Sequence, residues 1–207
     1  MLKYLILPAV ALVLSSSISA QVKFGIALDY EHIQSKSFSP IGTGNLYGGS
    51  LFFRVPVSKS LELDWSLDIA GGHVRTEYWQ MSPFPYDPPR EMSENRSTFY
   101  LGVPIHLVYD LPFRGGRVFA GPGIAWSHLH AVGTFPNGYH PTSGEAGGSV
   151  IAASFKAGFQ LYKYFILSGE FRPWISHAYV STSNLLSLKL GYELSTIKQS
   201  SHSHPNK

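Results

Sequence analysis

The chain has no cysteine, little charge and no long apolar run after its first residues, and each of these gaps excludes a class of protein. Without cysteine, its 207 residues hold no disulfide framework, no thiolate metal site and no cysteine nucleophile. Charged residues make up only 14% of the chain and the net charge is +3, without any dense run of Lys or Arg, so nucleic-acid binding has no electrostatic support. A spanning helix would need about 20 apolar residues, and no later segment approaches that length. If the mature chain lies in a membrane, it must therefore span it as a closed barrel.

Residues 1–20 are predicted to be a secretory signal peptide. Lys3 supplies the positive n-region, a short apolar core follows it, and the small residues at 17–20 form a cleavage site. The alternative is a buried N-terminal helix. We expect export with cleavage of this peptide, a folded barrel over residues 21–197, and a polar C-terminal tail over residues 198–207.

The alternation of apolar and polar residues is strictest over residues 60–71. Because successive side chains of a strand point to opposite faces, this segment predicts a strand with one apolar face and one acidic face. Such a strand fits a soluble barrel with an apolar interior, or a membrane barrel with an apolar exterior. The apolar face carries Leu61, Leu63, Trp65, Leu67 and Ile69, and the other carries Glu62, Asp64, Ser66 and Asp68.

Similar alternation recurs along the rest of the chain and predicts an even number of strands. Short connections are expected after the second, fourth and sixth strands, and long ones after the first, third and fifth, including loops over residues 81–95 and 133–148. This pattern predicts an all-β fold, an eight-stranded antiparallel up-and-down transmembrane β-barrel whose long loops face outward. The expected strands cover residues 22–33, 46–57, 60–79, 97–109, 117–131, 150–161, 165–179 and 184–197.

Small residues favour the membrane barrel over the soluble one. Gly and Ser share the parity of the charges, and the interior of an eight-stranded barrel is just wide enough for its own side chains. Bulky residues share the apolar parity, where lipid sets no limit on volume. Aromatic residues gather near the expected strand ends, as in interfacial girdles. These are Tyr30, Tyr78, Trp79, Tyr109, Tyr162, Tyr164, Trp174 and Tyr192. A soluble lipocalin-like carrier is the alternative.

The charged parity predicts a network of ion pairs inside the barrel. Buried charges must be paired, because each unpaired one costs several kcal/mol. Cations and anions on this parity are close to balance, so we expect a lumen plugged by salt bridges and no large diffusion channel. The expected network consists of Lys23, Asp29, Glu31, Arg54, Glu62, Asp64, Asp68, His106, Lys156, Glu170, Arg172, Lys189 and Glu193.

Several segments resemble the small outer-membrane β-barrel family of Bacteroidota, which includes PorT-like proteins and has an OmpA/OmpX-like fold. They are the Ala-Gln end of the signal peptide, YLGVPI at 100–105, AGPG at 120–123 and LSLKLGY at 186–192. The resemblance covers most of the mature chain and implies an integral protein of the Gram-negative outer membrane, without catalytic residues. Many such barrels end on an aromatic residue, and here the nearest candidate, Tyr192, precedes a polar tail.

We expect no enzymatic activity and no cofactor. The enzyme alternative is a lipid-A-modifying hydrolase, in which His177 acts as base for Ser176 or Ser181 at the outer rim. Glu170 or Glu193 would orient the histidine.

We expect no metal site either. His128 and His130 share one strand face and could hold a metal with His140, but polar histidines at a strand end are the simpler interpretation.

The expected role is structural or interaction-based: membrane integrity, adhesion, or service in a secretion or motility assembly. The expected partners of this monomer are outer-membrane lipid and lipopolysaccharide, and a protein bound through the long extracellular loops. Phe84, Tyr86 and Arg90 in the proline-rich loop are the predicted contact residues.

Overall fold

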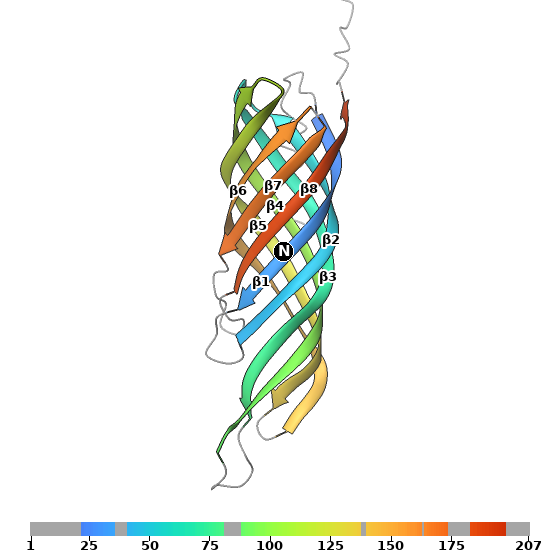
Figure 1. Ribbon diagram of the computed structural model, residues 1–207, viewed down its shortest axis with the longest axis vertical. Coiled ribbons are helices and arrows are strands. Elements are labelled where there is room, and N and C mark those ends of the chain that lie inside the picture. Colours follow the sequence, from blue (N-terminus) through green and yellow to red (C-terminus); the bar gives the residue numbers. More distant parts are fainter. Residues whose placement is uncertain are drawn as a thin grey trace, which may run out of the picture.

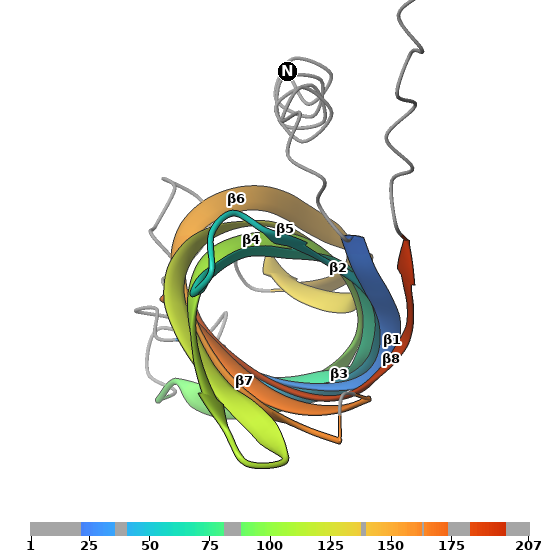
Figure 2. The same ribbon diagram turned by 90° about the horizontal axis from the view of Figure 1, so that it is seen from above.

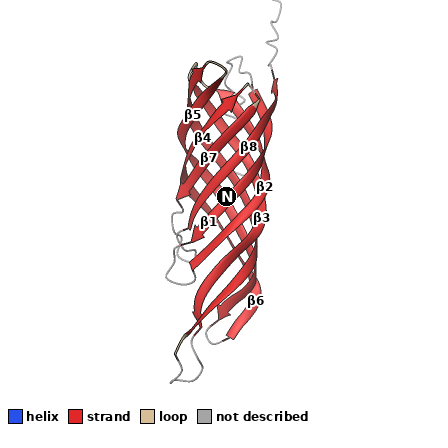
Figure 3. Ribbon diagram, viewed as in Figure 1, coloured by secondary structure: helices blue, strands red, loops and turns tan. Residues whose placement is uncertain are grey.

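The structure, a computed structural model, describes residues 22–35, 41–80, 88–137, 140–162, 164–173 and 183–197. These residues form β-strands and the short turns between them (Figure 3). Among them, no helix has the length and apolarity needed to cross a membrane. The strands are β1 (Val22–Ser35), β2 (Ile41–Pro56), β3 (Leu61–Gln80), β4 (Arg90–Phe113), β5 (Gly116–Asn137), β6 (His140–Leu161), β7 (Phe165–Pro173) and β8 (Ser183–Ile197).

The strands close into a ring in chain order. Each pairs antiparallel with the next, and β8 pairs antiparallel with β1, so every strand has a paired neighbour on both sides (Figure 2). The predicted fold class, an eight-stranded antiparallel up-and-down β-barrel, is confirmed. Val22 and Ile197 are partners, which places both ends of the described chain at one rim, together with the short β2–β3, β4–β5 and β6–β7 turns (Figure 1).

Side chains alternate between the interior and the outer wall along every strand. On β3, Asp64 and Asp68 are fully buried, whereas Ile69 on the opposite parity is 46% exposed. On β8, Lys189 is buried and Leu190 is 55% exposed. The interior therefore carries the charged parity and the outer wall carries the apolar parity. A lipocalin-like carrier requires the reverse arrangement, so that alternative is wrong.

The barrel is longer on one side than on the other. β3 to β6 have 20 to 24 residues each, whereas β7 has 9, and in Figure 1 the green and yellow strands extend well below β1 and β7. This corrects two predicted loops. β5 and β6 stay paired as far as Asn137 and His140, and β4 already pairs with β3 at Arg90.

The reason for both errors is that pairing with a neighbouring strand overrides a Gly/Pro/Ser-rich composition, since strand propensity depends strongly on context. Arg90 consequently lies on β4 rather than in a loop. Phe84 and Tyr86 lie outside the described residues, as do the predicted signal peptide, the polar tail, and residues 174–179 of the expected seventh strand.

Close approach of neighbouring strands explains one glycine directly. A Cβ at Gly48 on β2 would overlap the backbone carbonyl oxygen of Ile69 on β3. Gly71 on β3 follows Ala70, the register partner of Gly48. A Cβ at Gly71 would lie 3.8 Å from its nearest neighbour, the backbone oxygen of Thr98, which is an ordinary contact distance. Only the first of these two sites requires glycine for steric reasons.

Candidate functional site

The centre of the barrel interior is built on two aspartates of β3, each held by two cations. Asp64 accepts from Arg54 Nε at 2.8 Å and from Lys156 Nζ at 2.7 Å. All three side chains are at most 4% exposed, so their charges are screened little by water. The two contacts connect β3 with its neighbour β2 and, across the lumen, with β6.

Asp68 repeats this arrangement with different strands. It accepts from Arg172 Nη2 at 2.9 Å and from Lys189 Nζ at 2.6 Å, and the Ser66 hydroxyl donates to it at 2.7 Å. Arg172 lies on β7 and Lys189 on β8, so this carboxylate ties β3 to the opposite wall. Two cations for each anion give the pairs the extra partners that a buried carboxylate requires.

Glu170 and His106 extend the network toward β4. Arg172 Nε donates to Glu170 at 2.5 Å, and His106 Nε2 lies 3.3 Å from the same carboxylate oxygen. The hydroxyl of Ser154 lies 2.9 Å from that ring nitrogen, and a further nitrogen of Arg172 donates to the Tyr100 hydroxyl. All of these side chains are buried. Because Arg172 contacts both Asp68 and Glu170, the charged groups form one continuous cluster.

A second cluster lies at the rim with the short turns. Glu62 binds Lys23 at 2.5 Å and Arg117 at 2.6 Å, and Arg117 also binds Asp110 at 2.5 Å. The alternation of the sequence did not predict Arg117 and Asp110 in the lumen, because Arg117 stands at an expected strand start and Asp110 in an expected turn. Arg117 shares its parity on β5 with the buried Phe119, and Asp110 shares its parity on β4 with the buried Val108; these neighbours were the signal that could have placed both inside.

Glu193 is held by an amide rather than by a cation. Gln160 donates to Glu193 at 2.9 Å, and its own oxygen accepts from Arg117 at 2.7 Å and from Arg54 at 3.3 Å. Gln160 thereby joins the rim cluster to the central one, a role that its uncharged side chain did not suggest in the sequence.

Asp29 and Glu31 are inside the barrel but have weaker partners. Ser50 donates to Asp29 at 3.2 Å and Ser187 donates to Glu31 at 3.4 Å. Both carboxylates are buried, each has one oxygen without a hydrogen-bond partner, and neither has a cation within ion-pair distance among the described residues. This part of the interior carries an excess of carboxylates.

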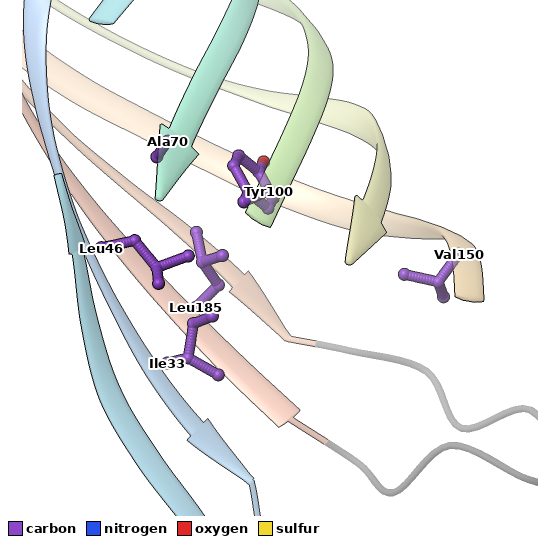
Figure 4. Packing of buried hydrophobic residues seen from close by; sticks show 6 residues of the cluster. All are labelled: Ile33, Leu46, Ala70, Tyr100, Val150 and Leu185. Carbon is purple, nitrogen blue, oxygen red and sulfur yellow. The ribbon is translucent and has the colours of Figure 1, made fainter. Parts of the chain in front are cut away.

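Apolar layers lie on either side of the charged centre. Toward the short turns, Phe52, Val108, Phe119 and Ile166 form one layer, and the Arg54 guanidinium lies 4.4 Å from the Phe119 ring centroid. Phe52 is thus part of the interior, although it interrupts the polar parity in the sequence. Toward the other rim, a second layer contains Ile33, Leu46, Ala70, Tyr100, Val150 and Leu185 (Figure 4).

The space that remains inside is small. A cavity of about 10 Å³ lies beside Arg54, Lys156 and Lys189, which is room for one water molecule. Within the described strands and turns, no group of three His, Cys, Asp or Glu side chains is placed to hold a metal ion. His128 instead lies 2.9 Å from the Ser149 hydroxyl.

The Ser154, His106 and Glu170 contacts resemble a catalytic triad only in residue type. In a triad the serine and the acid bind different nitrogens of the imidazole, whereas here both approach Nε2. His106 is also 1% exposed, so no substrate reaches it. Glu170 and Glu193 are both held by lumen partners, and His177, Ser176 and Ser181 lie outside the described residues.

Comparisons with known proteins give matches among solved structures. No protein-family model and no curated protein matches the sequence. Among solved structures, the fold is similar to Neisserial surface protein A, with a TM-score of 0.50 and 11% identity over 83% of this chain and 96% of that one. Ail, the attachment invasion locus protein of Yersinia pestis, gives a TM-score of 0.48 at 11% identity, over 86% of this chain and 100% of Ail. The N-terminal barrel domain of Pseudomonas aeruginosa OprF gives a TM-score of 0.32 at 16% identity, over 81% of this chain and 97% of that domain.

At such low identity the similarity to Neisserial surface protein A establishes the fold alone. The resemblance to OmpA/OmpX-like barrels is confirmed at that level. The relation to PorT-like proteins of Bacteroidota stays a prediction. The chain therefore has the fold of a small outer-membrane β-barrel, with an interior filled by paired charges and apolar layers.

Proposed function

We propose that this chain is an integral protein of the Gram-negative outer membrane, exported with a cleaved signal peptide, with a structural or interaction role. The observation that carries the proposal is the inverted distribution of polarity: the charges meet one another inside, and the apolar side chains face out. In water, an apolar wall around the whole barrel would be an extreme aggregation hazard. In a bilayer the same wall faces hydrocarbon, as in known transmembrane barrels.

The outer wall supports this placement in detail. Its outward apolar side chains are 44–71% exposed at positions such as Ile26, Leu28, Leu51, Ile124, Ile151, Phe155, Leu107, Leu188 and Leu190. Aromatic pairs mark both ends of this surface. Tyr164 stacks on Tyr192 with centroids 5.6 Å apart near the short turns, and Tyr30 lies 5.5 Å from Tyr47 toward the other rim. Such pairs suit the two membrane–water interfaces.

The sealed interior argues for a role on the outside of the barrel rather than for transport or catalysis. The ion pairs at Asp64 and Asp68 cross the lumen, and apolar layers cover them on both sides. We infer a monomer that contributes to membrane integrity, adhesion, or a secretion or motility assembly, and that contacts lipid, lipopolysaccharide or a protein partner through its outer surfaces.

The test is fractionation followed by electrophysiology. In a Gram-negative host, the full chain is expected in the outer-membrane fraction, resistant to carbonate extraction, with a gel mobility that changes on heating. In planar bilayers it is expected to give no large stable conductance. Recovery of folded protein from the periplasm without detergent would refute the membrane assignment. Steady porin-like currents would refute the plug.

The proline-rich connection between β3 and β4 offers a test of the interaction role. It contains Phe84 and Tyr86, and Arg90 is the first residue of β4 after it. Deleting residues 81–89 leaves the paired residues Gln80 and Arg90 in place. If this segment binds a partner, the deletion abolishes attachment of expressing cells while leaving heat-modifiable folded barrel. Unchanged attachment would assign the segment no contact role.

A further inference from the structure

The small cavity in the charged centre of the barrel is lined by hydrogen-bond donors. Its remaining lining is apolar or glycine, and no carboxylate of the described strands belongs to it. The polar lining consists of three cations and three serine hydroxyls, which come from Arg54, Lys156, Lys189, Ser50, Ser66 and Ser168. The cavity therefore offers positive charge and hydrogens to whatever it holds.

The two lysines of this lining have hydrogens without an acceptor. An ammonium group carries three hydrogens. Lys156 Nζ donates to Asp64 at 2.7 Å, and Lys189 Nζ donates to Asp68 at 2.6 Å and to Ser66 at 3.2 Å. Within the strands that the structure describes, two hydrogens of Lys156 and one of Lys189 are left over. Both side chains are at most 5% exposed, so bulk water does not reach these hydrogens freely.

The Ser168 hydroxyl points to the same need for a guest. Ser168 is 4% exposed and lines the cavity from β7, where it is the register partner of Lys189 on β8. Its hydroxyl forms no hydrogen bond with any group in the described part of the chain. A buried hydroxyl without a partner is unfavourable, so a guest that pairs with it stabilises the barrel.

The ion pairs around the cavity leave one positive charge over. The groups in contact are four cations and three carboxylates, namely Arg54, Lys156, Arg172, Lys189, Asp64, Asp68 and Glu170. His106 beside Glu170 adds positive charge only when it is protonated. The buried carboxylates of Asp29 and Glu31 are not part of the lining, and Ser50, which is, donates to Asp29 at 3.2 Å. The side of the cluster that faces the cavity is therefore cationic.

A halide ion suits this site better than a water molecule does. A halide only accepts, and every polar group of the lining can donate to it, with three of the donors charged. A water molecule must also direct its own hydrogens to acceptors, and the lining offers only serine oxygens next to three cations. The volume of about 10 Å³ admits a monatomic ion rather than an oxyanion. The flexible four-carbon stems of the lysines let their ammonium groups adjust to it.

We propose that the barrel binds one chloride ion in this cavity and that the ion stabilises the folded state. The ion connects Lys156 on β6, Ser168 on β7 and Lys189 on β8, and so ties the shortest strand to both of its neighbours. A ligand that binds only the folded chain shifts the folding equilibrium toward it. This inference goes beyond the proposed function and does not depend on the membrane placement.

The direct test uses bromide as the probe, because its X-ray absorption edge distinguishes it from water and from chloride. Crystals of the full chain, folded in detergent and grown in bromide, are expected to show an anomalous peak in the cavity beside Lys156, Lys189 and Ser168. An ordered water molecule at this place, without an anomalous peak, overturns the proposal.

The second test is urea unfolding in lipid vesicles with chloride or gluconate at equal ionic strength, since gluconate is too large for the cavity. We expect an unfolding equilibrium constant about tenfold smaller in chloride, as for a site whose dissociation constant is about a tenth of the salt concentration. In Ser168→Val, which removes the hydroxyl and fills the cavity with methyl groups, the difference between the salts is expected to fall below twofold.

Ser127→Val is the matched control, because Ser127 is also a buried lumen serine, 2% exposed, but lies outside the lining. It is expected to keep the full difference between the salts, and heat-modifiable mobility confirms that each variant is folded. Equal constants in the two salts for the parent chain, or a tenfold difference that survives in Ser168→Val, refute the chloride site. If Ser168→Val does not fold, the bromide peak decides. Failure of the parent chain to insert into vesicles counts against the proposed function alone, because the crystals test the ion in detergent.

Discussion

Replacing Asp68 with asparagine tests whether the ion pairs hold the barrel together. Asparagine keeps the size of the side chain and its hydrogen bonding to Ser66, but it removes the negative charge. Lys189 then keeps its hydrogen bond to the Ser66 hydroxyl, and Arg172 keeps Glu170 at 2.5 Å. Two cations that are at most 5% exposed thus lose the carboxylate that they share, and Glu170 remains in contact with one of them, Arg172.

The expected loss of stability is about 3–5 kcal/mol, the usual cost of removing one partner from a buried ion pair. Glu170 still compensates Arg172, so most of the cost falls on Lys189. This predicts partial recovery in the double variant D68N/K189M, because methionine removes the stranded cation and fills much the same volume. Without such a charge imbalance, a single polar substitution on a surface changes stability by about 0.5 kcal/mol or less.

The assay is reversible urea unfolding of the barrel in lipid vesicles, followed by tryptophan fluorescence, since Trp65 and Trp126 lie on the outer wall. The midpoint for Asp68→Asn is expected to fall well below that of the parent chain, and the double variant to regain at least about 1 kcal/mol. A midpoint shift worth less than about 1 kcal/mol for Asp68→Asn, in a barrel with unchanged cooperativity, would refute the reasoning.

Three further predictions address other parts of the barrel. Gly48→Ala is expected to lower the unfolding midpoint by an amount equivalent to about 1–3 kcal/mol, because its Cβ meets backbone, whereas Gly71→Ala is expected to be tolerated in the same urea assay. Leu190→Arg is expected to destabilise the inserted barrel by about 2–4 kcal/mol, the cost of a charge on the lipid face at the bilayer centre. Val132→Arg, close to the far end of β5, is expected to cost less than about 1 kcal/mol, because charges are tolerated near the membrane–water interface. Equal effects in vesicle unfolding would contradict the bilayer placement. Glu31→Gln is expected to be neutral or stabilising, since it removes a buried carboxylate that has no cation partner within the part of the chain that the structure describes, and a loss above about 2 kcal/mol would show that this carboxylate is paired.

The fold was predictable because the side-chain period of a strand is two and the barrel has two very different faces. Over residues 60–71 every position alternates, and the structure places Asp64 inside and Trp65 outside as that period requires. Strand ends were harder to predict. Residues 133–148 look like a loop by composition, but each strand of the β5–β6 hairpin provides the other with hydrogen-bonding partners that a single sequence does not reveal.

The sequence predicts which charged residues lie in the lumen, but it does not predict which of them form ion pairs with one another. Parity assigns Asp64 and Asp68 to the lumen, and each of them has two cations there. Which cation meets which aspartate depends on the stagger between strands and on the reach across the lumen, neither of which is written in the alternation. Gln160 was missed for the same reason, since an amide becomes part of a charge network only through its position.

The ion pairs specify the register of the strands more clearly than they raise the net stability of the barrel. Asp68 binds Arg172 and Lys189, which follow it by 104 and 121 residues, and Lys156 follows Asp64 by 92. A slip of one residue in any of these strands would move a charged side chain to the lipid face and leave its partner unpaired inside. Hydrophobic side chains on the outer wall do not discriminate between such registers, because lipid accepts any of them. The interior charges do, so the polar parity of this barrel selects one closed arrangement of eight strands from many that lipid alone would allow.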